Sequence, residues 1–221
     1  AGGAPIKFVA QGVKPACTED KYEARIYLTG EVQTRTENWH DLFNALVWLT
    51  FPRTKSALNA RHFEMIFQTS EAGNRGKTQD ALTLFDESGV VVLYSDDGMA
   101  DLLRGFQWHD LFWKRRRELN EVLGFMIFGH SLYEKALNPY IGFTGKGLLL
   151  KVDSNYFSLD MATQKESIDV LLAERLSSDW PIRAQDLTPV PLLGVPGWWE
   201  GNEEEAFYAN TRYFRPGCSV T

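Results

Sequence analysis

The sequence predicts a helix-rich α+β fold, in which αα-hairpins pack with a small antiparallel β-hairpin or sheet and a long irregular C-terminal segment follows. Three observations support this class. Apolar residues recur at helical spacing in several segments, short β-rich runs interrupt them, and five prolines follow residue 180. No Gly/Ser linker divides the 221 residues. We therefore expect one globular domain over residues 1–221.

Asn38 is the predicted N-cap of a helix from Trp39 to about Phe51. The helix should end at Phe51 because a proline disfavours helical geometry in the residue before it. Pro52 suits the first turn of a second helix, which we expect to reach about Gln68. The pair forms the predicted αα-hairpin.

The remaining elements are assigned from the same patterns. Residues 22–37 are expected to be extended around Gly30, and 74–78 to form a turn. A β-hairpin is predicted from 81–85 and 90–94, joined through 86–89. Helical segments follow near 98–104, 107–120 and 121–138, then a strand at 146–152 and a helix at 162–176. The segment from Trp180 onward should wrap around the body.

Composition excludes several classes of function. The chain is 44% hydrophobic and 24% charged, with a net charge of -6. A negative chain is a poor nucleic-acid binder, and its longest apolar runs are far too short to span a membrane. Cys17 and Cys218 are too few for a disulfide scaffold. No signal peptide is visible, so a cytoplasmic location is expected.

A pentapeptide occurs twice, as Trp39–Phe43 and Trp108–Phe112. His62 follows the first copy after 18 residues, and His130 follows the second after 17. This spacing suggests an internal duplication of the αα-hairpin over 39–64 and 108–134. Two interpretations remain open: repeated core packing, which we favour, or a pseudo-symmetric site in which histidines bind a divalent metal.

The first copy carries the candidate catalytic residues. On a helix, His40 and Asn44 share one face. Three polar residues share a face of the next helix, namely Lys55, Asn59 and His62. If both faces line one cleft, they supply a general base, an orienting amide and a cation for developing negative charge. The alternative is that these polar faces simply contact water.

Other motifs are weaker. The basic run Lys114–Arg117, with Arg104 nearby, is a possible contact for phosphate or an acidic partner, although such runs are usually solvated. Gly142–Gly147 lacks the spacing of a phosphate-binding loop, so no nucleotide motif is present. Asp80 and Asp86 are expected to be turn residues. Trp198–Trp199 and Glu203–Glu205 form a possible protein-binding surface.

Several segments resemble one bacterial family, catalogued as a domain of unknown function with the number three thousand and twenty-five. The segments are Asn38–His62, Asp80–Glu87, Phe128–Lys135, Asn138–Gly142, Leu193–Trp199 and Tyr213–Pro216. The resemblance covers about residues 26–216. It implies an intracellular bacterial protein and assigns no activity. It draws attention to the candidate residues above, together with Arg53, because they lie in the most recognisable segment.

Two functions from different classes follow. The first is a hydrolase, metal-assisted or not, that uses the cleft of the first helix pair and acts on a small molecule. The second is a non-catalytic protein- or ligand-binding module whose exposed tryptophans meet a partner. The first requires the polar residues to converge in one pocket. The second expects the histidines to be buried separately.

Overall fold

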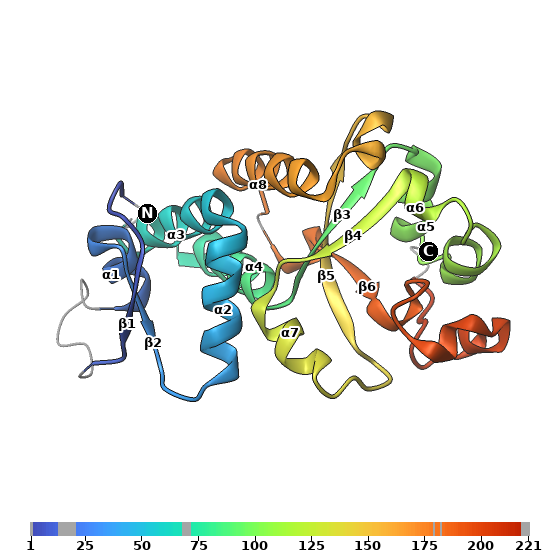
Figure 1. The fold of residues 1–221 in the computed structure, drawn as a ribbon, viewed down its shortest axis with the longest axis horizontal. Coiled ribbons are helices and arrows are strands. Elements are labelled where there is room, and N and C mark those ends of the chain that lie inside the picture. Colours follow the sequence, from blue (N-terminus) through green and yellow to red (C-terminus); the bar gives the residue numbers. More distant parts are fainter. Residues whose placement is uncertain (1, 13–20, 68–71, 179, 182, 218–221) are drawn as a thin grey trace.

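A four-stranded sheet forms the centre of the computed structural model (Figure 1). The structure describes residues 2–12, 21–67, 72–178, 180, 181 and 183–217. The strands, in spatial order, are β4 (Leu123–Ile127), β3 (Gly89–Tyr94), β5 (Thr144–Lys151) and β6 (Thr188–Pro191). β3 runs parallel to β5, and the other two pairs are antiparallel. Cys17, Cys218 and Gln68 lie outside the described residues.

Both faces of the sheet are covered by other elements. The central strand β3 is therefore buried along its whole length, and its side chains alternate between two cores. Val91 and Leu93 face one core, and Val90 and Val92 face the other. The helices against the first core are α2 (Trp39–Thr50), α3 (Pro52–Phe67), α4 (Ala72–Ser88) and α8 (Met161–Ser177). The second core holds α5 (Asp97–Arg104) and the C-terminal segment. The fold is therefore helix-rich α+β, as predicted.

A small N-terminal layer lies beside α2 and α3 (Figure 1). It contains α1 (Tyr22–Thr29) and two parallel strands, β1 (Lys7–Ala10) and β2 (Glu31–Thr34). Ile26, Val32 and Trp48 bury its apolar surface. This layer matters for function because it closes one side of the pocket described below.

The first helix pair is confirmed. The Asn38 side chain accepts a hydrogen bond from the backbone nitrogen of Asp41 at 3.0 Å, which caps α2 as expected. The chain leaves α2 at Phe51, and Pro52 is the first residue of α3. The predicted helix at α5, the strand at β5 and the helix at α8 are confirmed as well.

Several predicted elements are wrong, each for a physical reason. The predicted strand at 81–85 is the end of α4, since Ala81, Leu82 and Phe85 bury one helical face. Residues 86–88 of the predicted hairpin connection belong to the same helix. The predicted turn at 74–78 lies in the same helix. Tyr22–Thr29 is helical rather than extended. Gly30 ends this helix in the left-handed conformation, with φ of 73°.

The duplicated αα-hairpin is also wrong. The second pentapeptide copy enters a π-helical turn, Asp110–Lys114, and the helix expected to reach residue 120 is replaced by this turn and α6 (Leu119–Val122). The helix expected over 121–138 is in fact β4 followed by α7 (His130–Ala136). A strand thus separates the two halves of the second copy. Identical pentapeptides adopt different structures because their tertiary surroundings differ.

The C-terminal segment wraps around the body as expected. Its side chains complete the second core, where Leu192, Tyr208 and Phe214 are buried. The Tyr213 hydroxyl donates to the carbonyl of Phe143 at 2.7 Å. Trp199 packs against this core, so of the two adjacent tryptophans only Trp198, which is 40% exposed, lies mainly at the surface.

Gly129 positions α7, and with it His130, against the start of β3. A Cβ at Gly129 would lie 2.4 Å from the backbone nitrogen of Gly89 and 2.5 Å from the carbonyl oxygen of Glu87. We expect Gly129→Ala to lower the free energy of unfolding by about 3 kcal/mol, because backbone cannot move aside cheaply. Gly76→Ala, in the open on α4, should raise it by about 0.5–1 kcal/mol. Urea unfolding of both variants tests this pair, and equal effects would contradict it.

Candidate functional site

A polar pocket of about 430 Å³ lies between α2, α4 and the N-terminal layer. Three of the four histidines line it, namely His40, His62 and His130. They come from α2, α3 and α7. Asn44 and Asp86 line the same pocket. The fold therefore gathers imidazoles from three helices at one concave site, which is where acid–base chemistry is expected.

His40 and His130 are in direct contact. Their Nε2 atoms are 3.0 Å apart, which requires that one ring donates a proton and the other accepts it. His40 Nδ1 lies 3.2 Å from Glu134 Oε2, and His130 Nδ1 lies 3.9 Å from Asp86 Oδ2. The two rings thus lie in a row between two carboxylates.

The number of protons on the two rings decides which ring nitrogens carry hydrogen, and His130 Nδ1 is buried without a hydrogen-bond partner among the described residues. With both rings neutral, the shared proton lies between the Nε2 atoms, and one of the two outer Nδ1 atoms faces its carboxylate without a hydrogen. One added proton lets both outer nitrogens face a carboxylate with N–H. A second added proton would place hydrogens on both Nε2 atoms and break their contact. The Nε2 contact therefore couples the protonation of the two rings.

Asp86 connects this pair to a buried network. Its Oδ1 accepts a hydrogen bond from Lys55 Nζ at 2.6 Å, and Lys55 also donates to Asn44 Oδ1 at 2.9 Å. Asn44 Nδ2 in turn donates to the Tyr22 hydroxyl at 2.8 Å. Lys55 is buried beneath the pocket wall, so it orients Asp86 and Asn44 instead of reaching into the cavity.

The pKa values of Asp86 and His130 shift in directions that preserve this arrangement. Burial is the largest influence on Asp86 and opposes its ionisation, but the positive charge of Lys55, with contributions from His130 and His62, outweighs it. The pKa of Asp86 is therefore lowered, and the carboxylate stays charged. Burial lowers the pKa of His130, and Lys55 and His40 lower it further against the opposing charge of Asp86. The net effect on His130 is a lowered pKa, which favours its neutral form.

Tyr22 supplies a protonated hydroxyl to the same pocket. Although the residue is 38% exposed, its hydroxyl lies against Asn44. Burial raises its pKa, and the charges of Glu23 and Asp86 raise it further. Since the oxygen accepts from Asn44, its own hydrogen remains available to a ligand. Asn44 likewise has one amide hydrogen beyond the one used by Tyr22.

The five residues predicted from sequence separate into two layers. His40, Asn44 and His62 line the pocket, whereas Lys55 and Asn59 lie behind its wall. Asn59 Nδ2 donates to the backbone carbonyl of Glu23 and to its Oε2, at 2.9 and 2.6 Å. It therefore holds a residue of the pocket wall in place.

Sequence reasoning missed four members of the site. They are Tyr22, Asp86, His130 and Glu134. The spacing of the histidines gave a signal for His130, but we interpreted it as part of a duplicated αα-hairpin. Asp86 was expected in a turn, and Tyr22 in an extended segment. In the structure Asp86 lies on the face of α4 that points toward α3, where a carboxylate meets Lys55.

The other histidine, His109, does not join the site. Its Nε2 lies 2.8 Å from Glu205 Oε1 at the surface. The pseudo-symmetric four-histidine site is therefore wrong. Within the described parts of the chain, no group of three or more His, Cys, Asp or Glu side chains is arranged to hold a metal ion.

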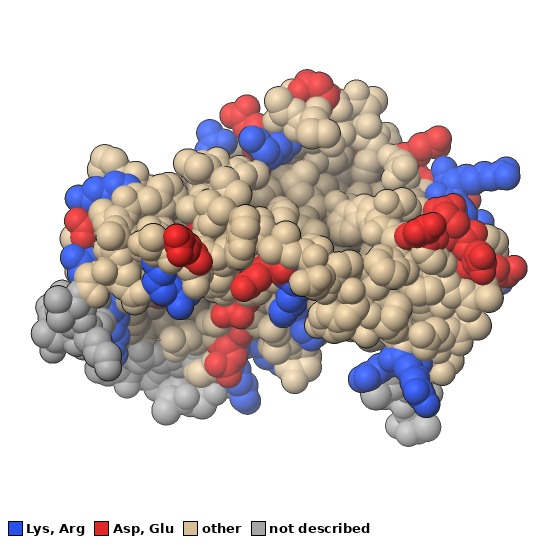
Figure 2. All heavy atoms as spheres, turned by 60° about the horizontal axis from the view of Figure 1, so that its bottom comes forward, with Lys and Arg blue, Asp and Glu red and all other residues tan. Residues whose placement is uncertain are grey.

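Three of the four residues in the basic run are paired with acidic neighbours. Lys114 pairs with Asp110, Arg115 with Glu118, and Arg116 with Glu203. On the face shown in Figure 2, basic side chains lie in small groups interspersed with acidic ones rather than in one patch. Arg53, at the start of α3, lies 3.7 Å from Glu166 and does not line the pocket. In the described residues, no helix has the length and apolar character needed to cross a membrane.

Burial of His130 predicts a pH dependence of stability. Above the pKa of the unfolded histidine, about 6.5, the ring is neutral in both states and does not change the free energy of unfolding. As the pH falls below 6.5, the unfolded state binds a proton that the folded state does not. The free energy of unfolding therefore decreases until the pH reaches the lower pKa of the folded state. Below pH 6.5, the loss approaches about 1.4 kcal/mol per pH unit. We expect His130→Gln to lose less stability than the wild type between pH 7 and pH 5. Parallel urea unfolding curves for the two proteins would contradict this.

Fold and pocket together define a helix-rich α+β protein with a histidine-lined polar site. The chain belongs to the family described as Protein of unknown function (DUF3025), whose model matches residues 6–218. This confirms the resemblance seen in the sequence. Neither the curated proteins nor the solved structures contain a match to the chain.

Proposed function

We propose that the protein is a hydrolase that uses water to split an ester or amide of a small molecule in the polar pocket. The observation that carries the proposal is the contact between His40 and His130, flanked by Glu134 and Asp86. A pair that takes up one proton and returns it is what general base and general acid catalysis require.

The charges of the pocket favour an acyl substrate over a phosphate ester. Four carboxylates and one guanidinium line the described part of the pocket, from Glu23, Asp41, Asp86, Glu87 and Arg35. Arg35 is paired with Asp41, and Lys55 behind the wall is paired with Asp86. Neither cation is available for a phosphate dianion, so an uncharged or cationic substrate fits better.

The chemical steps follow from the side chains present. The His40–His130 pair takes a proton from water as the water oxygen bonds to the carbonyl carbon. The resulting oxyanion accepts hydrogen bonds from the Tyr22 hydroxyl and the free amide hydrogen of Asn44. The bond to the leaving group then breaks, and the proton held by the His40–His130 pair passes to that group. Water and substrate give an acid and an alcohol or amine, and the enzyme regains its starting state.

A panel of chromogenic substrates tests this proposal. Nitrophenyl esters, nitroanilides, nitrophenyl phosphate and nitrophenyl glycosides are compared with wild-type protein and with the His40→Gln/His130→Gln double variant. We expect turnover in the ester or anilide group, and its loss in the double variant. Binding of these acyl substrates without turnover would favour a ligand-binding module instead. Turnover that the double variant retains would overturn the assignment to this pocket.

A further inference from the structure

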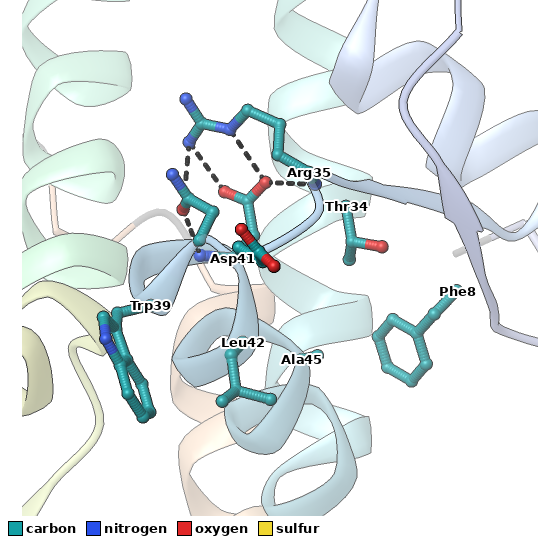
Figure 3. A pocket seen from close by; sticks show the side chains of 9 residues that line it. Phe8, Thr34, Arg35, Trp39, Asp41, Leu42 and Ala45 are labelled. Atoms are coloured by element: carbon teal, nitrogen blue, oxygen red, sulfur yellow. Dashed lines mark hydrogen bonds and ion pairs between the residues drawn. The ribbon is translucent and has the colours of Figure 1, made fainter.

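A second pocket, of about 590 Å³ and largely apolar, adjoins the polar one. Its apolar lining comes from Phe8 of β1 and from three residues on α2, Trp39, Leu42 and Ala45 (Figure 3). Its polar lining residues are Thr34, Arg35, Glu37, Asn38 and Asp41. Its volume lies in the range typical of small-molecule sites.

The lining of this pocket is unusually exposed for such large side chains. Trp39 is 58% exposed, Leu42 46% and Phe8 38%. Isolated apolar residues are common on protein surfaces, but several that line one hollow usually mark a binding site. Among the described residues, no side chain covers this surface, so it is open to a ligand.

The two pockets share a wall. Arg35 and Asp41 line both of them, and Asp41 lies between His40 and Leu42 in the sequence of α2. The Arg35 guanidinium donates to both carboxylate oxygens of Asp41, at 2.9 and 2.7 Å, and the Arg35 backbone nitrogen donates at 2.7 Å. Figure 3 shows this ion pair above Leu42. The charges of this wall are thus balanced, so it offers no free cation to an anionic headgroup.

We propose that the apolar pocket binds the hydrocarbon part of the substrate. The ester or amide group then lies on the other side of the Arg35–Asp41 pair, in the polar pocket next to His40. The substrate class is then an amphiphile, a medium-chain acyl ester or amide whose polar end is uncharged or cationic. This inference rests on the hydrolase proposed above and names its substrate. It is carried by the shared wall, which brings an apolar cavity beside the histidine pair.

Chain-length dependence tests the inference. We expect kcat/KM for nitrophenyl esters to rise about fourfold per methylene from acetate to octanoate, as the chain leaves water. Leu42→Ser should remove most of this rise, measured as the ratio of kcat/KM for octanoate to that for acetate in the same variant. Ala45→Phe, which fills the cavity, should do the same by a different route. Leu49→Ser is the matched control, since Leu49 is 67% exposed on α2 but does not line the pocket.

Binding of methyl ketones, which keep the carbonyl and the chain but have no leaving group, separates this inference from the hydrolase proposal. Calorimetry with acetone, 2-hexanone and 2-decanone should show affinity that rises with chain length, and Leu42→Ser should abolish the rise. The same binding pattern without hydrolysis of any ester would overturn the pocket as a substrate site and also the hydrolase. Hydrolysis of acetate with no chain-length effect in either assay would overturn the amphiphile alone.

A second copy of the chain is the main competing occupant, because Leu46 and Leu49 extend the exposed apolar surface along α2. Sedimentation measured over a range of protein concentration tests it. A monomer at every concentration, with Leu42→Ser and Leu49→Ser differing only in chain-length dependence, supports the substrate site. A dimer weakened equally by both variants would overturn it.

Discussion

Replacing Lys55 by methionine is expected to lower the free energy of unfolding by about 3 kcal/mol. Lys55 Nζ lies 2.6 Å from Asp86 Oδ1, and the exposed fractions of the two side chains are 4% and 16%. Methionine fills the space of the lysine stem but leaves the Asp86 carboxylate buried without its cation. For a chain of this size, the change lowers Tm by about 6–12 °C.

Two further variants separate this explanation from loss of packing. Lys55→Met/Asp86→Leu removes both charges, and we expect it to recover most of the lost stability. Lys165→Met, at an exposed position on α8, should change stability by less than about 0.5 kcal/mol. Urea unfolding at pH 7 measures all three. A double variant no more stable than Lys55→Met would show that the ion pair is not the cause.

Replacing either histidine of the pair by glutamine should lower kcat/KM by about 10²–10⁴-fold on the ester or anilide that the protein hydrolyses. Each ring depends on the other for its proton, since their Nε2 atoms share one. Loss of both should therefore cost little more than loss of one, because residues that act as a unit are not additive.

His109→Gln is the matched control for the pair. His109 sits in the second copy of the same pentapeptide, but it faces Glu205 at the surface. Its replacement should leave kcat/KM within about twofold, as expected for a residue that touches neither pocket. Circular dichroism at the assay temperature confirms that each variant is folded. Effects of His40→Gln and His130→Gln that simply multiply would show that the histidines act independently.

Local sequence signals predicted the parts of the fold that depend on neighbouring residues. Asn38 and Pro52 indicated where α2 and α3 begin, and the periodicity of residues 162–176 identified α8. These features are set within a few residues along the chain. The same reasoning failed at Ala81–Phe85, where a short apolar run fits both a strand and a buried helix face. Only packing against α3 and the sheet decides between them.

The candidate site was predictable only in part for a related reason. His40, Asn44 and His62 lie on faces that helical periodicity defines, so the sequence could group them. Asp86 and His130 join them through α4 and α7, which come together only when the sheet forms. Contacts between residues 90 positions apart, such as His40 and His130, leave no periodic trace in a single sequence.

The most direct test of the account is an NMR titration of the histidine rings, which needs no knowledge of the substrate. Long-range ¹H–¹⁵N correlation on ¹⁵N-histidine-labelled protein follows the protonation of each of the four rings with pH. We predict that His130 titrates below 6.5, and that its pKa rises in His40→Gln because the repulsion from His40 is removed. A His130 ring that titrates at or above 6.5 in both proteins would contradict the coupled pair.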